Sequence, residues 1–152
     1  MRDILLPNAI QLDLKAPSKK DVLQEIAQHT AGLTGQDAHV IFDVLWEREK
    51  LGTTGIGLGL AIPHGRLPGL SEVQGFFARL AEPVAFESVD NAPVDLVFLL
   101  LAPESAGADH LHALATVSRI LRDTDLCAKL RNARDEVAVY RLLTEAPAVQ
   151  AA

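Results

Sequence analysis

The sequence of 152 residues has little cysteine, an excess of acidic over basic residues and no long apolar run. Its single cysteine, Cys127, excludes an internal disulfide and cannot form a zinc site by itself. A net charge of −6 argues against nucleic acid or an anionic membrane as the main partner. The longest apolar run, residues 96–102, is far shorter than the roughly 20 residues that cross a bilayer. The N-terminus also lacks the features of a signal peptide, so we expect a cytoplasmic protein without membrane insertion.

The composition that is present is typical of one globular domain. Hydrophobic residues make up 49% and charged residues 22%, the usual balance of a folded chain. We find no repeat, no low-complexity block and no internal linker. We therefore expect one domain over residues 1–146, followed by a loose C-terminal tail over residues 147–152.

Helical and strand patterns alternate along the chain. Strands are predicted at residues 10–14, 60–63, 73–80 and 94–101, with a further short strand at 84–86. Helices are predicted at 18–32, 37–48, 109–122, 125–130 and 134–143, the first capped by Ser18 and ended by Gly32. The near-continuous apolar run at 94–101 is typical of a central strand covered on both faces. The sequence predicts an α/β three-layer sandwich with a central mixed β-sheet and helices on both faces.

Two of the five histidines stand out by their context. His64 ends the predicted strand 60–63, between Pro63, which fixes the backbone, and Gly65, which removes side-chain bulk. A neutral imidazole nitrogen exposed there could attack a phosphoryl group and form a labile phosphohistidine. His110 opens the helix 109–122, where the helix dipole favours a neutral ring whose N–H can donate to a phosphoryl oxygen. Read alone, a structural or solvent-facing histidine is the commoner case at both positions.

Arg48 is a third candidate. It ends the apolar stripe of the helix 37–48, where an arginine commonly snorkels or caps the last carbonyls. No metal or nucleotide site is predicted. His110 and His112 are two apart on a helix and point to different faces. The glycines at 55, 57 and 59 follow a helix and precede a strand, the reverse of a dinucleotide-binding motif.

Residues 49–65 contain a longer pattern. Glu49 is followed by a six-residue gap, Ile56-Gly57, two free positions, and then Leu60-Ala61-Ile62-Pro63-His64-Gly65. This resembles the active-histidine signature of the fructose/mannitol/nitrogen class of enzyme IIA, from the phosphoenolpyruvate:sugar phosphotransferase system. The segments 90–96 and 109–111, and Arg48 sixteen residues before His64, are also similar to that family.

The resemblance implies a phosphocarrier. His64 would accept a phosphoryl group on Nε2 from a histidine-containing phosphocarrier protein and pass it on, while His110 and Arg48 contact the phosphoryl oxygens. No cofactor and no metal are implied. We also expect an apolar docking rim of Leu58, Ile62 and Leu67, although core placement fits Ile62 equally well.

The chain looks most like the nitrogen-regulatory branch of the family. Asp3-Ile4-Leu5, the run 54–57 and Arg66 fit that branch, whereas Leu58 departs from an asparagine that is frequent there. Three functions stay open: phosphorylation-dependent regulation of target proteins, a sugar-permease subunit that passes phosphate to a IIB domain, and an interaction module with an idle His64. A small-molecule enzyme is a distant fourth, because neither paired carboxylates nor a Ser–His–Asp arrangement stands out.

Overall fold

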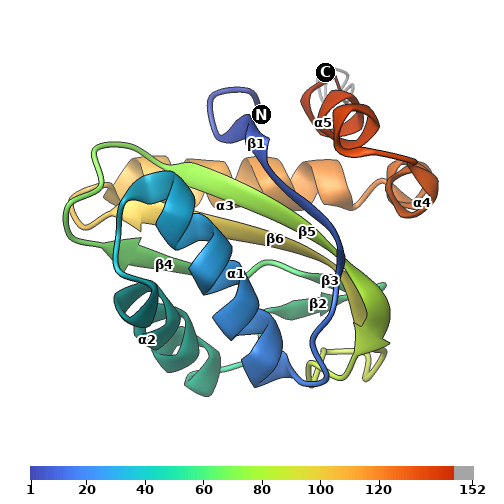
Figure 1. Cartoon of the computed structure of the whole chain (residues 1–152), viewed down its shortest axis with the longest axis horizontal. Coiled ribbons are helices and arrows are strands. Elements are labelled where there is room, and N and C mark those ends of the chain that lie inside the picture. Colours follow the sequence, from blue (N-terminus) through green and yellow to red (C-terminus); the bar gives the residue numbers. More distant parts are fainter. Residues whose placement is uncertain (146–152) are drawn as a thin grey trace.

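The computed structural model describes residues 1–145, and the predicted tail at 147–152 lies outside these residues. The chain forms a β-sheet with helices on both faces (Figure 1). The strands are β1 (Leu5–Leu14), β2 (Gly55–Gly57), β3 (Leu60–Ala61), β4 (His64–Leu67), β5 (Gln74–Val84) and β6 (Val94–Pro103). The helices are α1 (Lys19–Thr34), α2 (Ala38–Lys50), α3 (Gly107–Leu121), α4 (Thr124–Asn132) and α5 (Glu136–Thr144).

The sheet is mixed and is built around β6. Its order is β1-β5-β6-β3-β2, with β5 antiparallel to β6 and β1 parallel to β5. On the other edge of β6, first β3 and then β4 pair in parallel, so that Leu60 lies opposite Leu96 and His64 opposite Leu100. The link between these two short strands is Ile62-Pro63, which places His64 at the start of a new strand.

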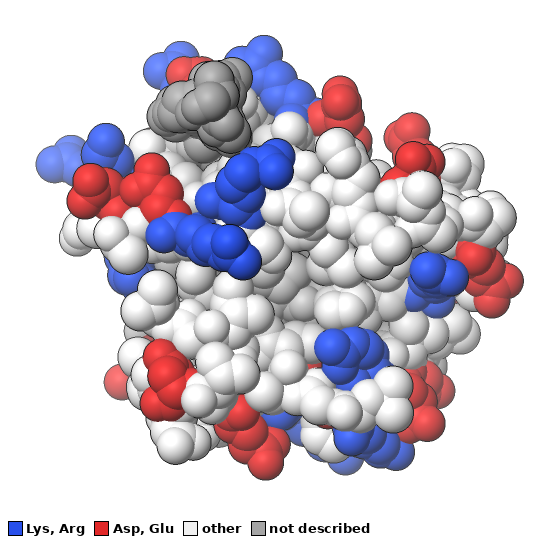
Figure 2. Space-filling view, turned by 180° about the vertical axis from the view of Figure 1, so that it is seen from behind, with Lys and Arg blue, Asp and Glu red and all other residues white. Residues whose placement is uncertain are grey.

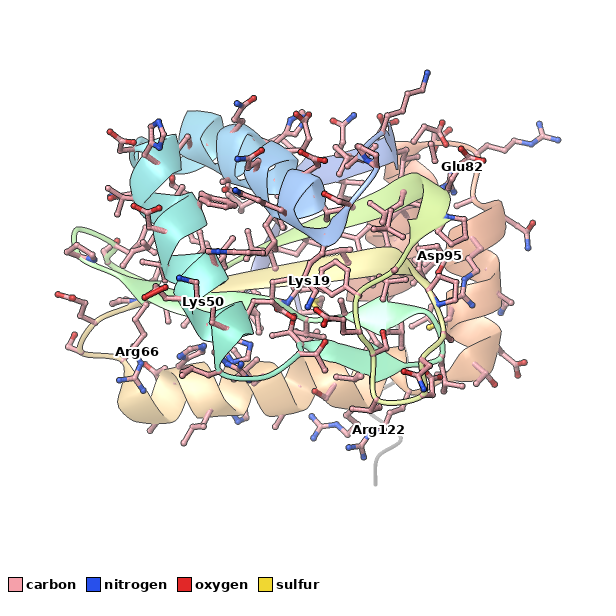
Figure 3. The ribbon with its side chains drawn as sticks, turned by 90° about the horizontal axis from the view of Figure 1, so that it is seen from below. Lys19, Lys50, Arg66, Glu82, Asp95 and Arg122 are labelled. Atoms are coloured by element: carbon pink, nitrogen blue, oxygen red, sulfur yellow. The ribbon has the colours of Figure 1, made fainter. Side chains whose placement is uncertain are left out.

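The placement of the helices on the two faces of the sheet confirms the predicted three-layer arrangement. Helices α1 and α2 lie over one face of the sheet and α3 lies over the other, as Figure 3 shows from below. Strand β6 is buried along its whole length except at the half-buried Asp95, as its apolar sequence predicted. The sheet therefore separates α2, which carries Arg48, from α3, which carries His110.

Several predicted element boundaries are wrong. Helix α1 continues past Gly32 to Thr34, because Gly35 is the residue that takes the left-handed conformation and donates its N–H to the carbonyl of Ala31. Strand β1 begins at Leu5, five residues before the predicted start, and an irregularity in its pairing with β5 follows that residue. The predicted strand at 84–86 is not separate, since Val84 is the end of β5 and pairs with Val94.

Candidate active site

His64 is half-buried at the first position of β4, and its ring is held by its own backbone neighbourhood. The Nδ1 atom lies 2.9 Å from the carbonyl oxygen of Ile62. Because a carbonyl oxygen only accepts, Nδ1 must carry the hydrogen, which leaves a lone pair on Nε2. The chain thus fixes the tautomer in which Nε2 is the nucleophilic nitrogen.

Arg48 reaches the same nitrogen from the opposite side of the sheet. Its Nε–H donates to Nε2 of His64 across 3.2 Å. A second N–H of the guanidinium, on Nη1, donates to the carbonyl oxygen of Gly52 across 2.8 Å. Gly52 lies beyond the end of α2 at Lys50, so this bond does not cap the last carbonyls of the helix; it holds the guanidinium beside His64.

His110 completes the group from the first turn of α3. Its side chain is only 6% exposed, so the interpretation of a histidine that simply meets water is wrong. The rings of His64 and His110 lie edge to face, with centroids 5.6 Å apart and planes inclined by 72°. Within residues 1–145, the buried Nε2 of His110 finds no hydrogen-bond partner. Such an atom is costly to leave unpaired, and it is suited to meet a group that arrives from outside.

Both rings are held in the neutral form. Burial lowers the pKa of His64, and the charge of Arg48 lowers it further, against the opposing hydrogen bond to Ile62 and the charge of Glu49. Burial also lowers the pKa of His110, and it is lowered further by repulsion from His64 when that ring is protonated and by the charge of Arg66. Burial thus favours the same neutral ring of His110 that the helix dipole favours. Neutral rings leave His64 able to attack and His110 able to donate.

Gly65 has a different role from the one that the sequence indicated. A Cβ atom at this position would overlap Cγ1 of Val44 in α2, so glycine is needed for close packing of α2 on β4 rather than to expose the imidazole. Successive residues of a strand alternate between faces. Gly65 faces α2, while His64 before it and Arg66 after it face α3.

The expected apolar rim is only partly present. Ile62 is 3% exposed and Leu67 is fully buried, so both belong to the core. The docking prediction is wrong for Leu67, and for Ile62 the alternative of core placement is the one that the structure shows. Leu58, in contrast, is 62% exposed and has a left-handed backbone with φ of 59°. Asp90 accepts its N–H across 2.9 Å and Arg131 donates to its carbonyl oxygen across 2.9 Å. These two partners hold the turn between β2 and β3 in a conformation that leucine disfavours.

Glu49 is a structural residue that the sequence identified only as part of the signature. Its buried carboxylate accepts three hydrogen bonds: from Nζ of Lys19 at 2.9 Å, from the backbone N–H of Thr54 at 2.9 Å and from the hydroxyl of Thr54 at 2.6 Å. These bonds tie α1, the end of α2 and the segment before β2 together. Because Glu49 follows Arg48 in the chain, the network fixes the helix end from which Arg48 extends.

The geometry supplies one nucleophilic nitrogen, one fixed guanidinium and one unpaired ring nitrogen on His110. This set suits transfer of a phosphoryl group, which needs positioning and charge neutralisation and little covalent help. Among residues 1–145, no group of three or more His, Cys, Asp or Glu side chains is placed to hold a metal ion. No helix in that part of the chain is long and apolar enough to cross a membrane.

Comparison with known proteins agrees with this chemistry. The profile of the family "Phosphoenolpyruvate-dependent sugar phosphotransferase system, EIIA 2" matches residues 3–146. The chain belongs to this family. A nitrogen regulatory protein of Bradyrhizobium diazoefficiens is 57% identical over 149 residues, which cover 98% of this chain and 97% of the relative.

Two further proteins are similar to this chain. A fructose-specific EIIA component of Haloferax volcanii is 38% identical over 109 residues, covering 72% of this chain and 71% of the relative. The crystal structure of the nitrogen regulatory protein IIA-Ntr of Neisseria meningitidis has a TM-score of 0.87 at 35% identity, covering 93% of this chain and 97% of that one. The resemblance to the nitrogen-regulatory type of EIIA is confirmed.

Proposed function

We propose that this EIIA protein accepts a phosphoryl group on Nε2 of His64 from a histidine-containing phosphocarrier protein, and that its phosphorylation state regulates target proteins. The observation that carries the proposal is the hydrogen bond from Nδ1 of His64 to Ile62, which leaves Nε2 as the free nitrogen beside Arg48. The tautomer, the cation and the unpaired donor of His110 all fit the same reaction.

In the proposed transfer, the Nε2 lone pair attacks phosphorus in line with the donor's P–N bond. As the new P–N bond forms, the old bond breaks and its electron pair returns to the donor's ring. The Nδ1 proton of His64 stays in place, and its bond to Ile62 stabilises the positive charge of the phosphorylated ring. The Nε–H of Arg48 loses its acceptor on Nε2 and turns to a phosphoryl oxygen, where a guanidinium binds well.

A protein donor also needs a surface on which to dock. The face of the molecule that carries α3 has a broad uncharged area with charged side chains mostly at its border (Figure 2). Leu111, in the first turn of α3 next to His110, is an exposed apolar residue. An uncharged centre with a charged rim is the usual composition of such an interface.

Phosphorylation of the purified protein tests the proposal. With phosphoenolpyruvate, enzyme I and the phosphocarrier protein, we expect a mass gain of one phosphoryl group that is labile in acid and stable in base. The gain should be absent in His64→Ala and retained in His112→Ala, a matched variant at an exposed histidine. Arg48→Lys keeps the positive charge but loses the forked pair of N–H donors of the guanidinium, so phosphoryl uptake should slow by roughly 10- to 100-fold.

Transfer onward separates regulation from sugar transport. A fructose-specific relative favours the second candidate, a permease subunit that passes phosphate to a IIB domain. Rapid transfer from the phosphorylated protein to a fructose-type IIB domain would support that candidate against regulation. If phosphorylation fails while both upstream proteins are active, an interaction module with an idle His64 becomes the better account.

A further inference from the structure

Arg66 lies beside the site and has no role in the function proposed above. It is two residues after His64 in β4, so both side chains project from the same face of the strand. Figure 3 shows Arg66 next to the beginning of α3, the helix that carries His110. The Nε atom of Arg66 is 3.5 Å from Nδ1 of His110, and the sequence offered Arg66 only as a mark of the regulatory branch.

This contact favours one position for the hydrogen of the His110 ring. An arginine N–H can only donate, so Nδ1 must present its lone pair. In a neutral ring the hydrogen then lies on Nε2, the atom that is buried and without a partner among the described residues. The opposite tautomer would set a ring N–H against an arginine N–H and would leave Nε2 with nothing to donate.

We propose that Arg66 is a positioning residue that holds His110 in the Nε2–H tautomer, so that this N–H can donate to a phosphoryl oxygen on His64. Arg66 does this from an exposed position and acts through His110. The inference rests on the proposed function of His64 for its consequence, whereas the tautomer is a property of the unphosphorylated protein. Partners that orient an active group in this way commonly change activity by roughly 10- to 100-fold.

Two measurements on the full chain test the proposal. In long-range ¹H–¹⁵N spectra of histidine-labelled protein, recorded above the histidine pKa, the wild type should show His110 with hydrogen on Nε2. Arg66→Met should lose this single tautomer and should slow phosphoryl uptake by roughly 10- to 100-fold. Arg122→Met, at the other end of α3, is the matched control and should change neither (Figure 3).

A double variant shows whether Arg66 acts through His110. Once His110→Ala has removed the ring, adding Arg66→Met should slow uptake no further. If the double variant is slowed by the product of the two single fold-changes, the proposal is overturned, because Arg66 would then act on the phosphoryl group independently of His110. A wild-type His110 with hydrogen on Nδ1, or an unchanged tautomer in Arg66→Met, would also overturn it. If the wild type takes up no phosphoryl group, the proposed function fails while the spectra still decide the tautomer.

Discussion

Replacing Gly65 by alanine tests whether α2 must pack directly on β4 to keep Arg48 at His64. The new Cβ atom would overlap Cγ1 of Val44, and β4 is fixed by its pairing with β6, so α2 has to move outward. Overpacking of this kind costs about 1–3 kcal/mol. A displacement of roughly 1 Å at a transfer site can cost on the order of 100-fold in rate. We expect Gly65→Ala to lower both the free energy of unfolding and the rate of phosphoryl uptake by amounts in these ranges.

Val44→Ala is the matched second change, because it removes the overlapping methyl group. Alone it should destabilise by about 1 kcal/mol, since Val44 is only half-buried. In the double variant, the free energy of unfolding should be at least about 1 kcal/mol higher than the two single losses, added together, would give. The rate of phosphoryl uptake should be restored in parallel. Urea unfolding and rapid-quench phosphorylation measure the two effects. Strictly additive losses, or a Gly65→Ala protein equal to wild type, would refute the reasoning.

Three further predictions concern pH, the Leu58 turn and the buried ion pair. Because the pKa of His64 is lowered from 6.5, uptake should be constant above that pH. Below about pH 6.5 the unfolded chain binds a proton that the folded protein does not, so the free energy of unfolding should fall with pH until the lowered pKa of the folded protein is reached. A rate that already drops between about pH 8 and 7 would contradict this. Leu58→Asn should raise the free energy of unfolding by about 0.5–1 kcal/mol by relieving left-handed strain, whereas Leu58→Ala should give no such gain in the same urea titration. Glu49→Gln should lower it by about 3 kcal/mol, because Lys19 loses its buried charged partner and keeps only the exposed Glu87 at 3.0 Å. A loss under about 1 kcal/mol would mean that Lys19 and Glu49 behave like a solvent-exposed ion pair.

The sequence predicted the fold where hydrophobic patterns are continuous. The run at 94–101 became the central strand β6, and the long helical stripe became α3, which begins two residues before its predicted start. The edge strand β1 was harder to delimit, because Pro7 and Asn8 interrupt its pattern and its pairing with β5 is irregular. Tertiary pairing, rather than local preference, sets the start of that strand.

The predicted site residues do come together, although spacing along the chain gave none of their distances. The sequence assigned His64 to the end of one strand, whereas it begins the next. That misplacement hid Arg66, because only a strand that starts at His64 puts the two side chains on one face. The same alternation sends Leu67 to the core. The packing of Val44 on Gly65 depends on the approach of α2 to β4 and has no signal in a single sequence.

The position of the phosphoryl group on His64 tests the central claim most directly. Protein labelled with ¹⁵N in its histidine rings would be phosphorylated through the phosphocarrier protein and its ring nitrogens examined by NMR. The account predicts a one-bond ³¹P–¹⁵N coupling at Nε2 of His64, with the hydrogen retained on Nδ1 toward Ile62. Coupling at Nδ1 of His64, or a phosphoryl group on another residue, would contradict it.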